Sequence, residues 1–238
     1  MKAHPTTRPS TSRREPETKL RRLIACGALA PVFALTMFVV AASRVEGYDH
    51  VSDTMSKLNA QGVVDQWPFT MGVVGYAVLM GFFSAGLRRH YSSSRTGRIL
   101  WTAIAVHAVL MIGVTGFHDD IRPGGFFTVE GAAHDVLAGL AFSALVIAML
   151  CMVALTRQDQ ALRASRSATI ILGAAMTVAG IAFMFISPDV QGVAQRVLVG
   201  LTAMWIILLA VRSMASARTD QAGEALRPEE PDHPSLGH

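Results

Sequence analysis

The sequence is poor in the charged side chains that ion pumps place inside a membrane. Charged residues make up 16% of the chain and hydrophobic residues 51%. No Asp, Glu, Lys or Arg lies in the interior of the long apolar segments, and His107 is the one clearly titratable group there. Ion-coupled transporters and proton pumps carry such residues within their spans. The pattern argues against a pump but leaves open a lipid flippase or a passive pathway.

Other familiar signals are also absent. The sequence contains no G-x-S-x-G motif, no P-loop, no G-x-G-x-x-G motif and no H-E-x-x-H motif. No pattern of basic and aromatic residues suggests a nucleic-acid partner. The only cysteines, Cys26 and Cys151, fall near the ends of spans that we place on the cytoplasmic side, so we expect no structural disulfide.

Long apolar segments dominate what is present. A helix needs about 20 residues to cross about 30 Å of hydrocarbon, and a helix pairs all its backbone groups in lipid. Six segments meet this requirement, and many small residues within them favour close helix packing. The sequence predicts an all-α fold, a polytopic membrane bundle of six transmembrane helices that cover about residues 23–43, 68–87, 99–117, 133–156, 167–188 and 192–212.

Lys and Arg are distributed unequally between the connecting segments. Most lie in the N-terminal segment, the second and fourth loops and the C-terminal tail, whereas the alternate loops hold only Arg44, Lys57, Arg122 and Arg196. Loops rich in Lys and Arg stay on the cytoplasmic side. We therefore expect both termini to be cytoplasmic, and we expect a multi-pass protein of the cell membrane that contacts membrane lipids.

Three regions follow from composition. Residues 1–22 are polar and basic, and residues 214–238 are polar and rich in Pro, so both are predicted to be disordered. Residues 23–213 form the transmembrane domain, whose first span we interpret as a retained helix, with a cleaved signal peptide as the alternative. In the first long loop, Ser52 to Gln61 is predicted to be a short helix at the interface, with Ser52 as N-cap and Gly62 after its end.

A cluster of His and acidic residues between Gly116 and Asp135 is the best candidate for a chemical site. His118, Asp119, Asp120 and His134 are residue types that bind zinc or a similar divalent metal. Asp119 and His134 could alternatively act as an acid/base pair, with Asp53 and Ser56 of the first loop closing over them. An equally weighted alternative is a solvated acidic loop in which Thr128 or Glu130 begins a helix.

Three further polar residues, His107, Asp189 and Arg196, could contribute to this candidate site. His107 and His118 fall on nearly one helical face, because eleven steps of about 100° approach three full turns. We favour a structural His107 that bonds a hydroxyl or carbonyl on a neighbouring helix. Asp189 and Arg196 could complete the rim of the site. A haem held by His118 and His134 is a less favoured alternative.

These motifs resemble a known family. Tyr48-Asp49-His50-Val51-Ser52-Asp53-Thr54-Met55-Ser56-Lys57-Leu58 with Gly62, followed by Gly116-Phe117-His118-Asp119-Asp120 and His134, is similar to the prokaryotic six-helix membrane proteins of domain-of-unknown-function family 998. Ser56, Leu58, Gly62, Asp119 and His134 match its pattern, whereas His118 stands where many members have Pro. The resemblance implies the six-helix fold and the place of the site but no reaction.

Two functions remain open from the sequence. The first is a metal-dependent hydrolase or lipid-modifying enzyme that uses His134 and Asp119. The second is a non-catalytic membrane protein that binds lipid, acts as a scaffold or passes an apolar molecule. The second predicts that bulky replacements at Gly75, Gly113 or Gly139 disrupt packing.

Overall fold

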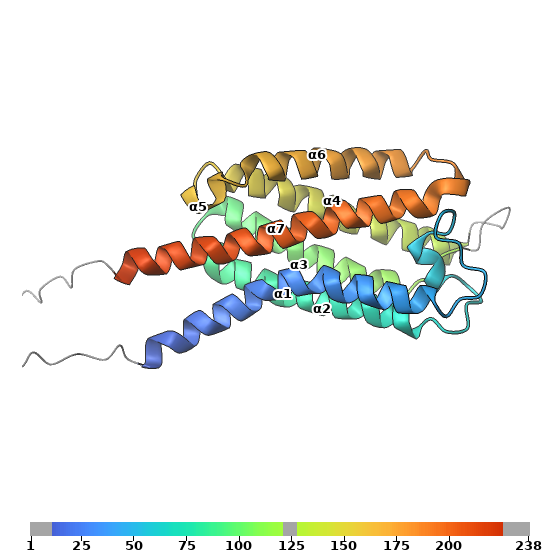
Figure 1. Cartoon of the computed structure of the whole chain (residues 1–238), viewed down its shortest axis with the longest axis horizontal. Helices are drawn as coiled ribbons and strands as arrows, with labels where there is room; N and C mark the ends of the chain where they lie inside the picture. Colours follow the sequence, from blue (N-terminus) through green and yellow to red (C-terminus); the bar gives the residue numbers. More distant parts are fainter. Residues whose placement is uncertain (1–10, 121–127, 226–238) are drawn as a thin grey trace, which may run out of the picture.

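The protein is built from long membrane-crossing helices. The computed structural model describes residues 11–120 and 128–225, and the described residues contain no β-strand (Figure 1). Six of their helices are long and apolar enough to cross a membrane, which confirms the predicted all-α bundle. These are α1 Thr11–Ala42, α2 Trp67–Tyr91, α3 Arg95–Thr115, α4 Val129–Leu155, α6 Arg166–Phe183 and α7 Gln191–Ala225. Shorter helices are η1 Met55–Asn59, α5 Gln160–Arg163 and η2 Pro188–Val190.

The six long helices form a closed ring. Each contacts the next in the order α1, α2, α3, α4, α6 and α7, and α7 returns to α1. The start of α1 and the end of α7 lie at one end of the bundle, here called the termini end (Figure 1). The opposite end, here called the loop end, carries the segment 43–66, the end of α3, the start of α4 and the α6–α7 connection.

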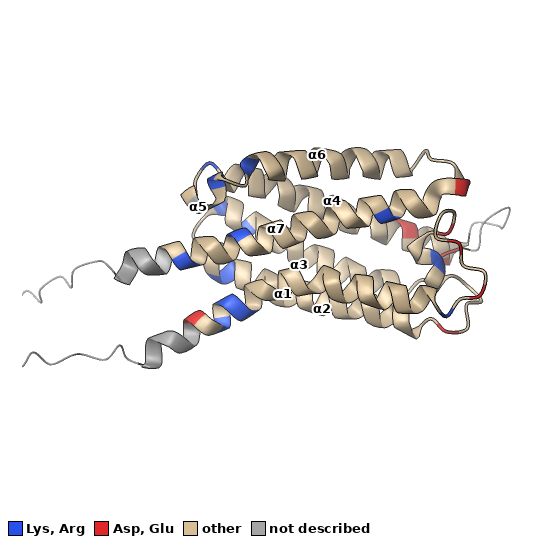
Figure 2. Ribbon diagram, viewed as in Figure 1, with Lys and Arg blue, Asp and Glu red and all other residues tan. Residues whose placement is uncertain are grey.

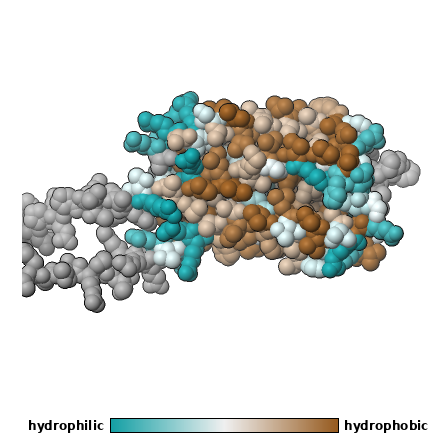
Figure 3. Space-filling view, viewed as in Figure 1, coloured by the Kyte–Doolittle hydropathy of each residue, from teal (hydrophilic) through white to brown (hydrophobic). Residues whose placement is uncertain are grey.

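Charge and hydropathy vary along the bundle from the termini end to the loop end. Figure 2 shows Lys and Arg gathered mostly at the termini end, whereas Asp and Glu lie mostly at the loop end. Between the two ends a hydrophobic belt covers the visible face of the bundle (Figure 3). A belt with polar rims matches a bilayer, because apolar side chains face lipid there without a penalty.

Local sequence explains where the helices begin. The Ser94 side chain accepts a hydrogen bond of 2.8 Å from the Gly97 amide, and the Thr128 side chain accepts one of 2.9 Å from the Gly131 amide. Each satisfies an amide that has no partner within its helix. Pro68 occupies the first turn of α2, where its missing N–H costs little.

The terminal helices extend further than the predicted spans. α1 begins at Thr11 and α7 continues to Ala225, so residues 11–22 and 214–225, which composition places in disordered tails, are helical in this structure. Extending an existing helix avoids the unfavourable nucleation step, and Glu, Lys, Arg and Ala are good helix formers. Residues 1–10 and 226–238, the rest of those predicted tails, lie outside the described residues.

The short helix of the first loop differs from the prediction. It is a 3₁₀-helix, Met55–Asn59, with Thr54 rather than Ser52 as its N-cap. It is buried rather than interfacial: Leu58 is 1% exposed and packs with Ala41, Phe69 and Val73 of α1 and α2. Its apolar residues face the bundle and not the lipid. The segment therefore closes the loop end of the bundle.

Two further predictions need correction. The fifth helix ends at Phe183 and not near residue 188, because Ser187 and Pro188 begin the separate 3₁₀-helix η2. Of Gly75, Gly113 and Gly139, where bulky replacements are expected to disrupt packing, Gly75 alone is tightly packed: an added Cβ would lie 2.1 Å from the Phe33 ring. An added Cβ at Gly139 would meet no atom within 4 Å, and one at Gly113 would make ordinary contact with Leu137.

Candidate functional site

A cavity lies inside the bundle, in the half nearest the loop end. Its volume is about 210 Å³, larger than the roughly 150 Å³ apolar cavity that suffices to bind benzene in another protein. The lining comes from α1, α2, α3, α4, α7 and η1 and is almost entirely apolar. It comprises Pro31, Ala34, Leu35, Phe38, Met55, Ser56, Phe69, Val73, Tyr76, His107, Met111, Val114, His134, Ala138, Ala141, Phe142, Leu145, Gln195, Leu198, Val199, Thr202, Ala203 and Ile206.

His107 lies in the cavity wall with both ring nitrogens occupied. Its Nδ1 donates to the Ala141 carbonyl at 2.9 Å, so its Nε2 accepts from the Tyr76 hydroxyl at 2.8 Å. The two rings meet edge to face. These contacts join α2, α3 and α4 through one neutral imidazole. They are the structural hydroxyl and carbonyl bonds favoured for His107 from the sequence.

His134 differs from His107 because one ring nitrogen is unused. The side chain is 4% exposed and stands in the second turn of α4, where its Nδ1 donates to the Phe117 carbonyl at 2.9 Å. The carbonyl can only accept, so the neutral ring leaves Nε2 as an acceptor. Within the described residues Nε2 has no hydrogen-bond partner. His134 is therefore a buried residue of the cavity wall with an unoccupied acceptor nitrogen.

Ser56 and Gln195 add polar groups at the loop end of the cavity. The Ser56 hydroxyl donates to Thr54 Oγ1 at 3.0 Å, which leaves its oxygen able to accept. Gln195 also lines the cavity; its Oε1 accepts a hydrogen bond from the Met55 amide, and its NH₂ group has no partner among the described residues. The two side chains come from η1 and from the second turn of α7.

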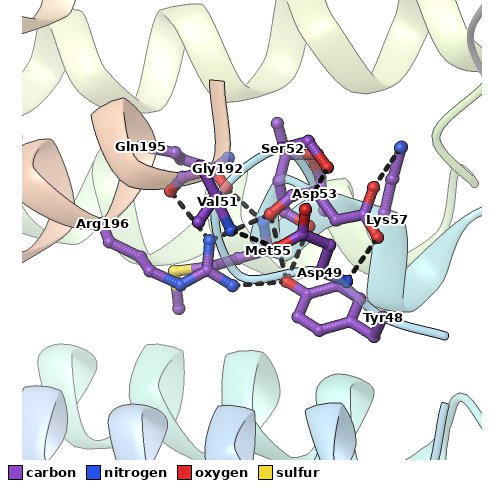
Figure 4. A network of polar contacts seen from close by, with 12 residues as sticks. Tyr48, Asp49, Val51, Ser52, Asp53, Met55, Lys57, Gly192, Gln195 and Arg196 are labelled. Carbon is purple, nitrogen blue, oxygen red and sulfur yellow. Dashed lines mark hydrogen bonds and ion pairs between the residues drawn. The ribbon is translucent and has the colours of Figure 1, made fainter. Parts of the chain in front are cut away.

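The roof of the cavity is the segment Tyr48–Asn59, which is fastened to the start of α7 (Figure 4). Arg196 donates to the Tyr48 hydroxyl at 2.7 Å, to the Asp53 carbonyl at 2.9 Å and to His50 Nδ1 at 3.0 Å. Tyr48 donates in turn to the Thr54 carbonyl at 2.9 Å. Burial raises the pKa of the Tyr48 phenol above its ordinary value, which keeps this donor protonated, although Arg196 partly opposes the shift.

Backbone packing brings the roof close to α7. The Val193 amide donates to the Val51 carbonyl at 3.0 Å. An added Cβ at Gly192 would lie 2.4 Å from the Asp53 carbonyl oxygen and 2.8 Å from that of His50. Only a residue without a side chain lets the two segments approach this closely.

Asp53 stabilises the roof through contacts with other residues of the same segment. Its Oδ1 pairs with Lys57, and its Oδ2 accepts from the Asp49 amide at 2.9 Å. Asp49 in turn accepts from the Val51 amide at 2.9 Å and from the Ser52 hydroxyl at 3.1 Å. These bonds to the carboxylate hold the pKa of Asp49 below its usual value. Asp53 thus stabilises the loop. Ser56, which the sequence analysis places in the same candidate site, lines the cavity instead.

Asp120 supports the first turn of α4. The carboxyl is 6% exposed, accepts from the Thr128 hydroxyl at 2.5 Å and from the Thr128 amide at 3.1 Å. An added Cβ at Gly131 would lie 2.3 Å from the same carboxyl. A carboxylate at a helix N-terminus is favourable because the amides there carry partial positive charge. Thr128 is the N-cap, as the structural alternative from the sequence expects.

Asp119 joins two loops through its backbone. Its amide donates to the Asn59 carbonyl at 3.3 Å and its carbonyl accepts from the Gln61 amide at 3.1 Å, which makes a short parallel bridge with Ala60. Its carboxylate accepts from the Asp120 amide at 2.8 Å. The bridge fixes the segment after η1 against the end of α3.

His118 lies beside this bridge with both ring nitrogens engaged. Nδ1 is 2.5 Å from Glu130 Oε1, and Nε2 is 3.0 Å from Gln66 Oε1. Glu130 lies in the first turn of α4 and Gln66 directly precedes α2, so the ring joins the starts of these two helices. Neither nitrogen is free for a metal or a haem in this arrangement.

The residues predicted as metal ligands therefore do not converge. Among the residues that the structure describes, no group of three or more His, Cys, Asp or Glu could hold a metal ion. His118, Asp119 and Asp120 lie at the junction of the two loops, whereas His134 faces the cavity. Of the expected rim, Arg196 joins the roof, but the Asp189 carboxylate contacts Ser187 at 3.3 Å instead. Residues 121–127 of the predicted cluster lie outside the described residues.

Several polar residues escaped the sequence reasoning. Gln61 donates to Thr128 Oγ1 at 3.1 Å, Gln66 donates to the Ala60 carbonyl at 2.8 Å, and Gln195 supports η1. These glutamines belong to none of the catalytic or metal-binding motifs that the sequence was compared with. A usable signal was the position of Gln195 and Arg196 at the start of an otherwise apolar helix.

Comparisons with known proteins give a family but no activity. Neither the curated proteins nor the solved structures contain a match to this chain. One family model matches, and it covers residues 28–212, from the second half of α1 to the middle of α7. Because this match includes every membrane-crossing helix, the chain belongs to the family described as "Protein of unknown function (DUF998)".

Proposed function

We propose that this integral membrane protein binds an apolar molecule, such as a lipid chain, in the cavity beneath η1. The observation that carries the proposal is a cavity of about 210 Å³ whose wall is apolar apart from a few hydrogen-bonding groups. Binding sites for small molecules have this composition: apolar walls and few polar groups. The proposal is the non-catalytic alternative from the sequence.

Access from the bilayer fits this role. Leu35 of α1 lines the cavity and is also 38% exposed on the surface of the bundle. Thr202 of α7 lines the same cavity and is half-buried. At the loop end, η1 covers the cavity, and the hydrogen bonds of Arg196 hold the segment around η1 against α7. A ligand would therefore arrive between α1 and α7 from the lipid rather than from water.

The proposal includes an orientation and a location. The termini end carries most Lys and Arg, so we place it in the cytoplasm and the loop end outside it (Figure 2). The protein is then a multi-pass protein of the cell membrane. The ligand site lies in its outer half.

The hydrolytic alternative has less support from the contacts. His118 and Asp120 already have other partners, whereas His134 lines the cavity and its Nε2 has no partner among the described residues. Elemental analysis of the chain, purified without chelators, tests this alternative directly. We expect well under one zinc or manganese per chain, whereas about one metal per chain that is lost in His134→Ala would favour the metal-dependent enzyme.

A photolabelling experiment tests ligand binding. The full chain in lipid nanodiscs is irradiated with a hydrocarbon chain that bears a diazirine, and labelled residues are located by mass spectrometry. We expect label on cavity residues such as Phe38, Met111 and Leu198.

A matched pair of variants separates the cavity from the lipid-facing surface. Ala138→Phe places a ring into the cavity, whereas Gly139→Phe, on the next residue of α4, points into open space. Label in the cavity should fall several-fold in Ala138→Phe and persist in Gly139→Phe. Unlabelled cavity residues in the wild type, or equal labelling in both variants, would contradict the proposal.

A further inference from the structure

The loop end of the cavity has a defined hydrogen-bonding character. His134 Nε2 is an acceptor, because Nδ1 carries the proton that is donated to the Phe117 carbonyl. His134 is 4% exposed and lines the cavity, and Nε2 lacks a partner within the described part of the chain. An acceptor in the wall of an apolar cavity costs free energy when an apolar ligand displaces water and leaves it without a partner. A ligand that donates a hydrogen bond here would remove that cost.

The wall also restricts the charge of a ligand. None of the described residues that line the cavity is Asp, Glu, Lys or Arg. An ionised head group would lose its hydration without gaining a counter-charge, which is unfavourable in an apolar site. Phosphate, carboxylate and ammonium heads are thus disfavoured, whereas a neutral polar head is acceptable.

Other polar groups complement a head that both donates and accepts. The Gln195 side-chain oxygen already accepts from the Met55 amide, so this side chain can offer a ligand its N–H donors. Ser56 Oγ can accept, because its proton is donated to Thr54. A hydroxyl group can donate to an acceptor such as His134 Nε2 or accept from a donor such as the Gln195 amide, whereas an ether or a hydrocarbon end cannot donate.

We infer that the ligand is a neutral amphiphile with a hydroxyl head, which donates its proton to His134 Nε2 while its hydrocarbon chain lies toward α1 and α7. This inference rests on the proposed function and names the class of molecule that the cavity takes. Long-chain alcohols and lipids with a free hydroxyl share this chemistry. The cavity of about 210 Å³ holds the head and the first part of the chain, and the remainder extends into the bilayer.

The inference is tested with two probes: an alcohol, and an ether in which a methyl group replaces the hydroxyl proton. Radiolabelled 1-dodecanol is bound to the full-length protein in detergent, and unlabelled 1-dodecanol and dodecyl methyl ether compete for it. Ala138→Phe supplies the background of non-specific binding. In the wild type, the alcohol should compete at least roughly fivefold better than the ether, since an unsatisfied buried acceptor costs about that factor or more.

His134→Leu removes the acceptor, and there the alcohol and the ether should compete equally. If this variant does not fold, as judged by gel filtration, the comparison of the two probes in the wild type decides. Equal competition in the wild type, above the Ala138→Phe background, overturns the hydroxyl inference and leaves the proposed function standing. Binding no greater than that background overturns both.

Discussion

The hydroxyl of Tyr76 on α2 donates a 2.8 Å hydrogen bond to Nε2 of His107 on α3, and both groups are buried in the middle of the bundle. A membrane interior offers no water to replace this bond. The pair therefore contributes to the packing of the bundle.

Removing the hydroxyl should destabilise the bundle. Tyr76→Phe leaves His107 Nε2 without a donor, and we expect a loss of about 1–3 kcal/mol in the free energy of unfolding. A double-mutant cycle with His107→Leu checks the cause by thermal unfolding in detergent. The double variant should lose less than the sum of the single variants. Strict additivity would show that the hydrogen bond contributes nothing.

The approach of α7 to the roof depends on Gly192. Gly192→Ala would bring a Cβ to 2.4 Å from the Asp53 carbonyl oxygen, and backbone cannot move aside cheaply. We expect a loss of about 1–3 kcal/mol. Gly200→Ala, on the same helix with no atom within 4 Å of the added Cβ, is the control and should be neutral or stabilise the helix by about 0.5–1 kcal/mol. Similar stability of the two variants would argue against the close contact.

Arg196 should control the mobility of the roof. Arg196→Ala removes its bonds to Tyr48, His50 and the Asp53 carbonyl, so amides in Tyr48–Asn59 should exchange with deuterium roughly tenfold faster or more. Arg196→Lys should not restore protection, because an ammonium group lacks the planar fork of donors.

The control for Arg196 is Arg44→Ala. Arg44 pairs with Asp65 at 2.7 Å, and both side chains are well exposed. Such pairs contribute less than about 1 kcal/mol. The account of the roof fails if exchange is equally fast in the Arg44 and Arg196 variants.

The lowered pKa of Asp49 predicts that the stability of the loop around it depends on pH. Bonds from Val51 and Ser52 hold its pKa below the model-peptide value of 3.8. A depressed carboxyl pKa stabilises the folded loop above the unfolded pKa, and this contribution disappears as the pH falls through the folded pKa. Amide protection at residues 49–53, corrected for intrinsic exchange, should be constant from neutral pH to about 4 and fall below it. Asp49→Asn should remove the step, and an unchanged step would assign it to another group.

The spans were predictable because they follow from local composition. An apolar run of about 20 residues must pair its own backbone in lipid, whatever its neighbours are. The helical extensions at Thr11 and Ala225 were not predictable from this rule, because water-exposed turns depend on the helix to which they are attached.

The site was only partly predictable. Ser56 and His134 were named from the sequence, and both line the cavity. Asp119 and Asp120 have the residue types of a metal site, but their partners Asn59 and Thr128 are set by the contact of two distant loops. Gln195 was missed because its role depends on the Met55 amide, far away in the chain. Periodicity and motif spacing do not encode such long-range partners.

The most direct test of the central claim is native mass spectrometry of the full chain with 1-dodecanol, for the wild type, Ala138→Phe and Gly139→Phe. Our account predicts one bound alcohol per chain in the wild type and in Gly139→Phe, and none in Ala138→Phe, whose added ring occupies the cavity. Equal binding in all three proteins, or binding in none, would contradict a ligand site between α1, α4 and α7.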